Sequence, residues 1–142
     1  MPVGISRHTN TERSDWTASE DDGIRYFSGT ADYTATLNLN EEINGDAVIS
    51  LGNVRNIAKV TVNGTECGIA WKAPFVVEIP AGVLKAGNNE ITITVANLWV
   101  NRIIGDMQPG SKQRFTVTPR DFYKADSKLL PSGLLGPVEL KY

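Results

Sequence analysis

Aromatic and planar polar side chains occur together at three places in the chain, and such combinations can bind a sugar. An aromatic ring stacks on the apolar C–H face of a pyranose, while amide, carboxylate and cationic groups form hydrogen bonds with its hydroxyls. The residues with these properties are Trp71, Lys72, Trp99, Asn101, Arg102, Asp106 and Tyr123. They could contact a carbohydrate or a neighbouring domain, and they form the candidate site of this chain.

Strand parity offers a structural role for two of these aromatic residues. Trp71 has the parity of Cys67 and Ile69, and Trp99 has the parity of Val95. Because alternate residues of a strand face the same side of a sheet, both rings are predicted to point inward unless their strands end before them. Packing in the core or at its rim is the preferred interpretation, and direct contact with a ligand is the alternative.

The other candidates lie in two segments without a strand pattern, residues 99–112 and 119–135. Loops of this length are uncommon in compact domains and usually bind something or pack on a neighbour. Arg102 and Asp106 could pair and brace the first loop, or contact a neighbouring domain or a glycan. Tyr123 offers an aromatic ring beside a cation, and packing over the end of the fold is its preferred role.

Catalytic and metal-binding constellations are not expected in this sequence. One histidine, His8, and one cysteine, Cys67, cannot supply a zinc site of the usual type, and a Ser-His-Asp triad would have to use a histidine near the N-terminus. Cys67 is predicted to be a small core residue. The acidic runs at residues 20–22 and 41–42 are interpreted as solvated turns rather than as a glycosidase carboxylate pair. A structural calcium ion is an alternative, although the acidic residues do not have the spacing of an EF-hand.

Length and composition fit one globular domain. The chain has 142 residues, 41% of them hydrophobic and 21% charged, with a net charge of −2. No block of like charges marks a nucleic-acid binder, and no apolar stretch approaches the roughly 20 residues that span a bilayer. Neither nucleic acid nor membrane is therefore an expected partner. The N-terminus has no apolar stretch of the kind found in a signal peptide.

Alternating apolar residues predict many short strands. Residues 1–23 are polar and are predicted to form an N-terminal arm, with Asp15, Trp16 and Thr17 the one hint of packing. Strand patterns follow at residues 33–39, 47–51, 75–79, 91–95, 115–118 and 138–141, and one helical turn is expected at residues 81–86. Residues 24–142 are therefore predicted to form an all-β, antiparallel jelly-roll sandwich of about eight or nine strands.

A hairpin at Asn63-Gly64 is the most specific local prediction. This dipeptide suits a two-residue type I′ turn, because both positions need a positive φ. The turn predicts a register that can be listed pair by pair: Val62 with Thr65, Thr61 with Glu66, Val60 with Cys67, Lys59 with Gly68, Ala58 with Ile69, and Asn56 with Trp71. In this register one face of the hairpin is apolar and the other is polar.

The order of these fragments carries a resemblance. The run from Val60 to Trp99, with flanking residues 23–31, 97–106 and 130–138, resembles the galactose-binding-type β-sandwich modules of glycoside hydrolases. It looks like the C-terminal module of bacterial enzymes of family 2 and of the α-L-rhamnosidase (family 106) and β-galactosidase-like kind. The resemblance covers roughly residues 14–142. In such enzymes the catalytic carboxylates lie in a separate barrel domain, so no catalytic residue is transferred to this chain.

The resemblance implies a non-catalytic accessory domain of a larger glycoside hydrolase. Its expected partner is the catalytic barrel domain of the same chain, and carbohydrate binding is a further expectation. Structural support of the barrel is ranked first, because parity places both tryptophans inward. The implied location is the periplasm or the cell exterior. A free-standing adhesion or protein-interaction sandwich is the alternative function.

Overall fold

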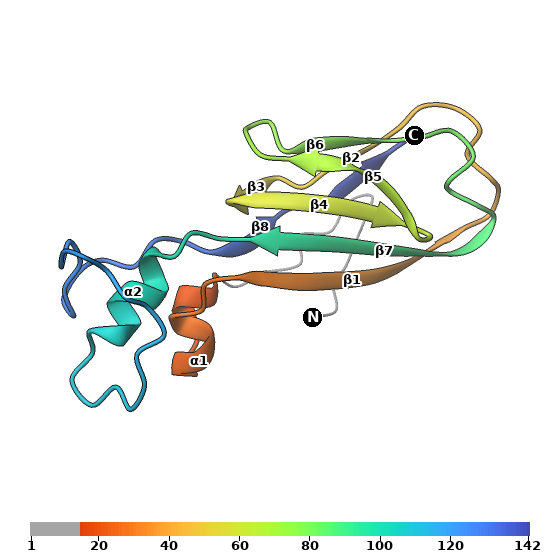
Figure 1. The fold of residues 1–142 in the computed structure, drawn as a ribbon. Helices are drawn as coiled ribbons and strands as arrows, with labels where there is room; N and C mark the ends of the chain where they lie inside the picture. Colours follow the sequence, from red (N-terminus) through yellow and green to blue (C-terminus); the bar gives the residue numbers. More distant parts are fainter. Residues whose placement is uncertain (1–14) are drawn as a thin grey trace.

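The computed structural model describes residues 15–142, which fold as a mostly β structure (Figure 1). Within these residues there are nine strands: β1 (Thr30–Leu39), β2 (Ala47–Ser50), β3 (Asn53–Arg55), β4 (Ile57–Val62), β5 (Thr65–Ala70), β6 (Val76–Ile79), β7 (Gly87–Ala96), β8 (Gly133–Gly136) and β9 (Glu139–Lys141). Three short helical segments accompany them: η1 (Trp16–Ala18), α1 (Asp22–Arg25) and α2 (Val100–Asp106). The predicted all-β class is confirmed, while the jelly-roll connectivity stays a prediction. Residues 1–14 of the predicted N-terminal arm, which include His8, lie outside the described residues.

Antiparallel sheets form the body of the fold. β1, β7, β4 and β5 make up one sheet in that order, β6, β2 and β9 make up a second, and β3 pairs with β8. The helices α1 and α2 and the chain after α2 lie beyond one end of the sheets (Figure 1). This end is called the helical end below. In the part of the chain that the structure describes, no helix is long and apolar enough to cross a bilayer.

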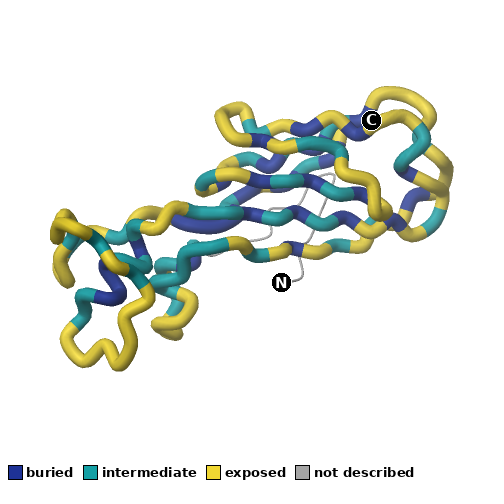
Figure 2. Tube along the Cα trace, in the orientation of Figure 1, coloured by how far each residue is buried: buried dark blue, intermediate teal, exposed yellow. Residues whose placement is uncertain are grey.

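The core follows the predicted alternation. Ile91, Ile93 and Val95 of β7 are at most 1% exposed, and they belong to the same core cluster as Ile49 of β2 and Leu140 of β9. Buried and less buried residues alternate along these strands (Figure 2). The predicted inward faces of these strands are therefore confirmed, and burial of their apolar side chains is the main force that holds the sheets together.

The hairpin turn is confirmed, but the predicted register holds only near the turn. Asn63 and Gly64 have φ values of 49° and 80°, and the pairs next to the turn are as predicted. Beyond them the register shifts by one residue, because a β-bulge leaves Cys67 as the extra residue of β5. Val60 then faces Gly68. Cys67 itself is half-buried against the core, and burial raises the pKa of its thiol.

The bulge reverses the sides of the residues that follow it. The observed pairs are Lys59 with Ile69 and Ala58 with Ala70. Ala70 is therefore buried, while Ile69 is 61% exposed. The predicted pairs Ala58 with Ile69 and Asn56 with Trp71 are wrong for this reason.

Three predictions of local structure are also wrong. Residues 81–86 form turns rather than a helical turn, and the helix α2 lies inside a predicted loop. The expected strand at residues 115–118 is absent from the described residues: Phe115 is 59% and Val117 is 99% exposed. Apolar and polar residues do alternate in this part of the sequence. The backbone N–H groups of Phe115 and Thr116, however, donate to the side chain of Asp106 instead of to a neighbouring strand.

The hint of packing near the N-terminus is confirmed for Trp16. This side chain is 3% exposed, its indole Nε1 donates to the hydroxyl of Tyr33 at 2.7 Å, and its ring meets Phe27 edge-on at 5.4 Å between centroids. A Cβ at Gly133 would lie 2.7 Å from that indole nitrogen, and the φ of Gly133 is 105°. Trp16 thus closes the core against β8 at a position where glycine is required.

Candidate functional site

Both candidate tryptophans are exposed, which corrects the prediction that they point inward. Trp71 is 65% and Trp99 is 61% exposed. Trp71 follows the bulged strand and therefore shares the outer face with Ile69, and Lys72 places its Nζ 5.1 Å from the centroid of the Trp71 ring. β7 ends at Ala96, so the alternation stops before Trp99, which is the residue preceding α2.

Asn101 has a structural role in α2. Its side chain is 1% exposed, donates to the carbonyl of Leu130 at 2.7 Å and to the hydroxyl of Ser132 at 2.9 Å, and accepts from the backbone N–H of Leu130 at 2.8 Å. Asn97 reaches the same hydroxyl and also binds the backbone of Phe27. These amides join the start of α2 to the chain before β8, and they leave Asn101 no surface for a ligand.

Arg102 and Asp106 form the predicted pair. Their spacing places both on one side of α2, and Arg102 Nε donates to Asp106 Oδ1 at 2.9 Å. The other carboxylate oxygen accepts the backbone N–H groups of Phe115 and Thr116 at 2.9 and 2.7 Å, and the Thr116 hydroxyl at 2.7 Å. The side chain of Asp106 is fully buried, whereas that of Arg102 is 17% exposed. Loop bracing is therefore the role of Asp106.

The electrostatics of Asp106 favour its ionised form. Burial works against ionisation, but the hydroxyl and backbone N–H of Thr116, the N–H of Phe115 and the charge of Arg102 outweigh it and hold the pKa below the ordinary value. Every bond that Asp106 accepts is thus made to a carboxylate. Such charge-assisted bonds are stronger than bonds between neutral groups.

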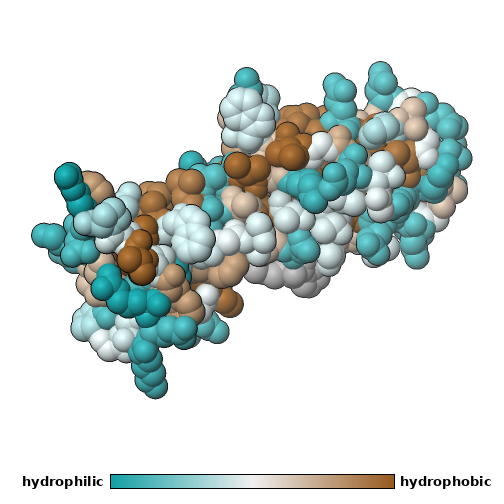
Figure 3. Space-filling view, in the orientation of Figure 1, coloured by the Kyte–Doolittle hydropathy of each residue, from teal (hydrophilic) through white to brown (hydrophobic). Residues whose placement is uncertain are grey.

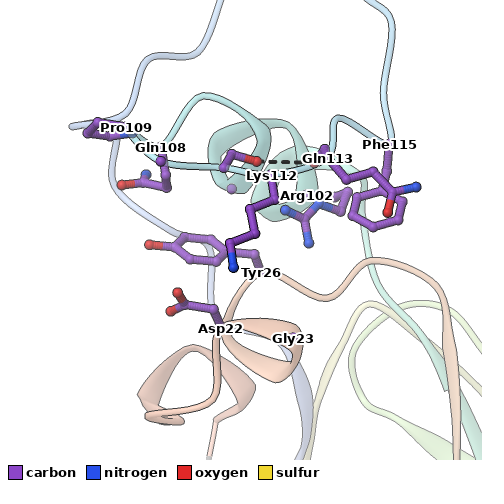
Figure 4. Close-up of a pocket in the computed structure, with 12 residues that line it drawn as sticks. Asp22, Gly23, Tyr26, Arg102, Gln108, Pro109, Lys112, Gln113 and Phe115 are labelled. Atoms are coloured by element: carbon purple, nitrogen blue, oxygen red, sulfur yellow. Dashed lines mark hydrogen bonds between the residues drawn. The ribbon is translucent and has the colours of Figure 1, made fainter.

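A pocket of about 390 Å³ opens between α1, α2 and the chain that follows α2 (Figure 4). Its described lining includes Tyr26, Arg102, Gln108, Lys112 and Phe115. The guanidinium carbon of Arg102 lies 5.0 Å from the centroid of the Phe115 ring and 6.0 Å from that of Tyr26. Figure 4 shows the side chain of Lys112 extending across the pocket toward Tyr26.

Gly105 allows this pocket to form. A Cβ at this position would lie 2.6 Å from Arg102 Nη2 and from two atoms of Tyr26. Only a residue without a side chain lets α2 approach Tyr26 so closely. The close approach places the guanidinium of Arg102 against the Tyr26 ring.

The structure separates the candidate residues into different places. Arg102 lines the pocket and Asp106 braces it, Asn101 is buried nearby, Trp71 and Lys72 lie on the outer sheet face, and Tyr123 is half-buried outside the pocket lining. Sequence reasoning missed Tyr26, Gln108, Lys112 and Phe115, because packing of α1 beside α2 brings them together. Within residues 15–142, no group of three or more His, Cys, Asp or Glu residues is placed to hold a metal ion.

Comparison with known proteins relates the chain to parts of much longer enzymes. No protein-family model matches it. A protein of Formosa agariphila with the provisional name beta-glucuronidase is 35% identical over 164 aligned residues, which cover 97% of this chain and 14% of that protein. The solved structure of a rhamnosidase from Novosphingobium sp. PP1Y is 41% identical and superposes with a TM-score of 0.82, over 89% of this chain and 12% of the rhamnosidase.

A more distant similarity concerns the fold alone. A β-glucuronidase from Ruminococcus gnavus is 22% identical and superposes with a TM-score of 0.52, over 59% of this chain and 15% of that enzyme. In all three comparisons this chain matches only a small part of the longer enzyme, 12 to 15% of its length. The chain is thus homologous to one small β-sandwich module of much longer glycoside hydrolases.

Proposed function

We propose that this chain is a non-catalytic accessory module that packs against another domain of a glycoside hydrolase. The observation that carries this proposal is the distribution of exposed apolar side chains. Twelve large hydrophobic residues are exposed in the described part of the chain, and six of them lie in one segment: Leu98, Trp99, Phe115, Val117, Phe122 and Leu130. Hydrophobic side chains are visible at the helical end in Figure 3, and others lie over the sheets. Clustered exposed apolar side chains are typical of an interaction surface.

The segment that carries these side chains is held by buried polar contacts. Asp106 binds the backbone at Phe115 and Thr116, and Asn101 binds the backbone at Leu130. A surface that is already ordered loses less entropy when it binds a partner. These contacts therefore support docking on another domain by the helical end.

The carboxylates at the pocket support a non-catalytic role. Glycoside hydrolysis generally uses two carboxylates on either side of the bond that is cleaved. Among the described residues that line the pocket, Asp22 is the only one with a carboxylate. The side chain of Asp106 is fully buried, and both of its oxygens already accept hydrogen bonds from other residues of this chain. On this proposal the catalytic groups belong to a separate domain of the parent chain, which works in the periplasm or outside the cell.

A chimera would test the docking role. This chain would replace the matching module of the Novosphingobium rhamnosidase, and a truncated form of that enzyme would lack the module. We expect the chimera to be soluble and active, and the truncated enzyme to aggregate or lose thermal stability. Phe122→Asp in the chimera should lower its melting temperature and leave that of the isolated chain unchanged.

The matched control is Ile69→Asp, which changes an apolar residue of similar exposure on the outer sheet face. This control should have little effect on the chimera. If Ile69→Asp destabilised the chimera and Phe122→Asp did not, docking by the helical end would be wrong.

Carbohydrate capture is the second candidate function, and the exposure of Trp71 and Trp99 favours it. An NMR titration with rhamnose, galactose and short oligosaccharides would follow the indole N–H signals. Saturable shifts at Trp71 or Trp99 would support capture, with the buried Trp16 as an internal control. Unchanged indole signals with every sugar would contradict capture by the tryptophans.

A further inference from the structure

The pocket between α1 and α2 has the size and chemical character of a small-molecule site. Its volume of about 390 Å³ lies in the range of ligand pockets, roughly 300–1,000 Å³. Residues far apart in the sequence line it, from Asp22 and Tyr26 beside α1 to Lys112 and Phe115 after α2. None of the roles described above uses the open space of this pocket.

Arg102 presents an oriented guanidinium at this pocket. Its Nε is bound to Asp106 at 2.9 Å, and its guanidinium lies near the Phe115 and Tyr26 rings. The two terminal amino groups donate no hydrogen bond to any residue that the structure describes, although the side chain is only 17% exposed. A guanidinium fixed in this way is suited to a carboxylate, which it can bind through two parallel hydrogen bonds.

Lys112 adds a second positive charge. Within residues 15–142 it has no ion pair or hydrogen bond, and Figure 4 shows its side chain over the pocket. The one carboxylate of the described lining, Asp22, lies 3.6 Å from Arg25. Because Asp106 offsets the charge of Arg102 and Arg25 offsets that of Asp22, the charge of Lys112 remains to attract an anion.

The remaining lining favours a sugar over a small inorganic anion. Tyr26 is half-buried, and its hydroxyl makes no hydrogen bond with the described residues. Gln108 donates to two carbonyls and keeps its side-chain oxygen available as an acceptor. An aromatic ring and amide groups are what the C–H face and the hydroxyls of a pyranose require, whereas a small anion would leave most of the pocket empty.

From these contacts we propose that the pocket binds a carboxylate-bearing monosaccharide unit, a uronate. Arg102 and Lys112 bind the carboxylate, Tyr26 lies against the ring, and Gln108 accepts a hydroxyl. This proposal goes beyond the docking role and does not depend on it, because the pocket is formed within this chain alone.

The test is an NMR titration of the isotope-labelled 142-residue chain. The ligands are the methyl glycosides of glucuronic and galacturonic acid, each matched with its neutral glucoside or galactoside, and acetate as a bare carboxylate. We expect one uronide to shift, with saturation, the Arg102 Nε–H signal and the backbone amide signal of Gly110, which also lines the pocket. Its dissociation constant should be at least about tenfold lower than those of its neutral match and of acetate.

Two lysine variants locate the site. Lys112→Gln should raise the dissociation constant of the uronide by about fivefold or more, while Lys72→Gln, which removes an exposed cation beside Trp71, should leave it unchanged. Equal affinity for uronide and neutral glycoside, equal affinity for uronide and acetate, or an unchanged affinity in Lys112→Gln would each overturn the proposal. None of these outcomes would bear on the docking experiment, which measures the stability of a chimera.

Discussion

Thr116 donates both its backbone N–H and its hydroxyl to the same oxygen of Asp106, each at 2.7 Å. Together with the N–H of Phe115, this gives Asp106 Oδ2 three donors. The chain leaving α2 is thus bent back and fixed to the helix. The arrangement sets the Phe115 ring beside Arg102 and forms one wall of the pocket.

Replacing Asp106 with Asn should weaken this bracing. In either orientation the NH2 group of the introduced amide faces donors, either Arg102 Nε–H or those of Phe115 and Thr116, so one set of bonds is lost. Arg102 also loses its counter-charge, and we expect unfolding to become easier by about 3 kcal/mol. Urea denaturation at neutral pH measures the change. Asp22→Asn is the matched control, because this exposed side chain should change stability by no more than about 0.5 kcal/mol. Equal stabilities of the two variants would contradict the bracing role.

The same carboxylate gives stability a defined pH dependence. Folding depresses the pKa of Asp106, so its contribution is fully present above the ordinary aspartate pKa of about 3.9 and is lost as the pH falls through the lower folded-state value. The difference in unfolding free energy between wild type and Asp106→Asn should be constant from about pH 7 to 5 and should shrink below about pH 4. Denaturation curves across this range would measure it. A difference that grew on acidification would show that the sign is wrong.

Gly105→Ala should destabilise the chain although alanine favours helices. The added Cβ would lie 2.6 Å from Tyr26, so Tyr26 or α2 must move, at a cost of about 1–3 kcal/mol. Gly45→Ala is the control, because its added Cβ meets nothing within 4 Å. A gain in melting temperature for Gly105→Ala would mean that helix propensity dominates and that the contact with Tyr26 is not tight.

Replacing the buried Trp16 should destabilise the fold far more than replacing the exposed Trp71. Trp16→Ala should cost about 3–5 kcal/mol because this buried side chain also binds Tyr33. Trp71→Ala should cost no more than about 0.5 kcal/mol, since the ring is 65% exposed. Thermal unfolding followed by circular dichroism would compare them. A large loss for Trp71→Ala would restore the core role that strand parity predicts.

Gly64→Val tests the hairpin turn. Gly64 has a φ of 80°, which a β-branched residue adopts only with strain, so we expect a loss of about 1 kcal/mol or more. No heavy atom outside the immediate chain neighbours lies within 4 Å of a Cβ built there, so the loss reports the backbone rather than a clash. An unchanged midpoint of urea denaturation would count against the type I′ turn.

The strands and the turn could be predicted because their signals are local. Alternation along Ile91, Ile93 and Val95 reports burial directly, and Asn63-Gly64 reports backbone geometry. The bulge could not be predicted, because residues 67–71 are all apolar or small. Such a run fits either parity, so the side on which Trp71 lies was not determined by the pattern.

The candidate site was only partly predictable for a different reason. Pairing of Arg102 with Asp106 is one of the alternatives for a predicted loop, and the helix α2, which the pattern does not predict, brings the two onto one side. The pocket depends on the packing of α1 beside α2, and Tyr26 and Lys112 are too far apart in the sequence for any periodicity to connect them. Gly105 carries the one local signal, since a glycine inside a helix often has a packing reason.

The extra residue at Cys67 shifts the alternation of inward and outward side chains in β5 by one position. Each residue after it changes sides, so Ile69 and Trp71 lie outside while Ala70 lies within. Loss of one codon there would exchange the two sets and leave the turn and the strand order as they are. The bulge therefore keeps Trp71 on the outer face, and its loss would turn Ile69 and Trp71 toward a core that would have to repack around them.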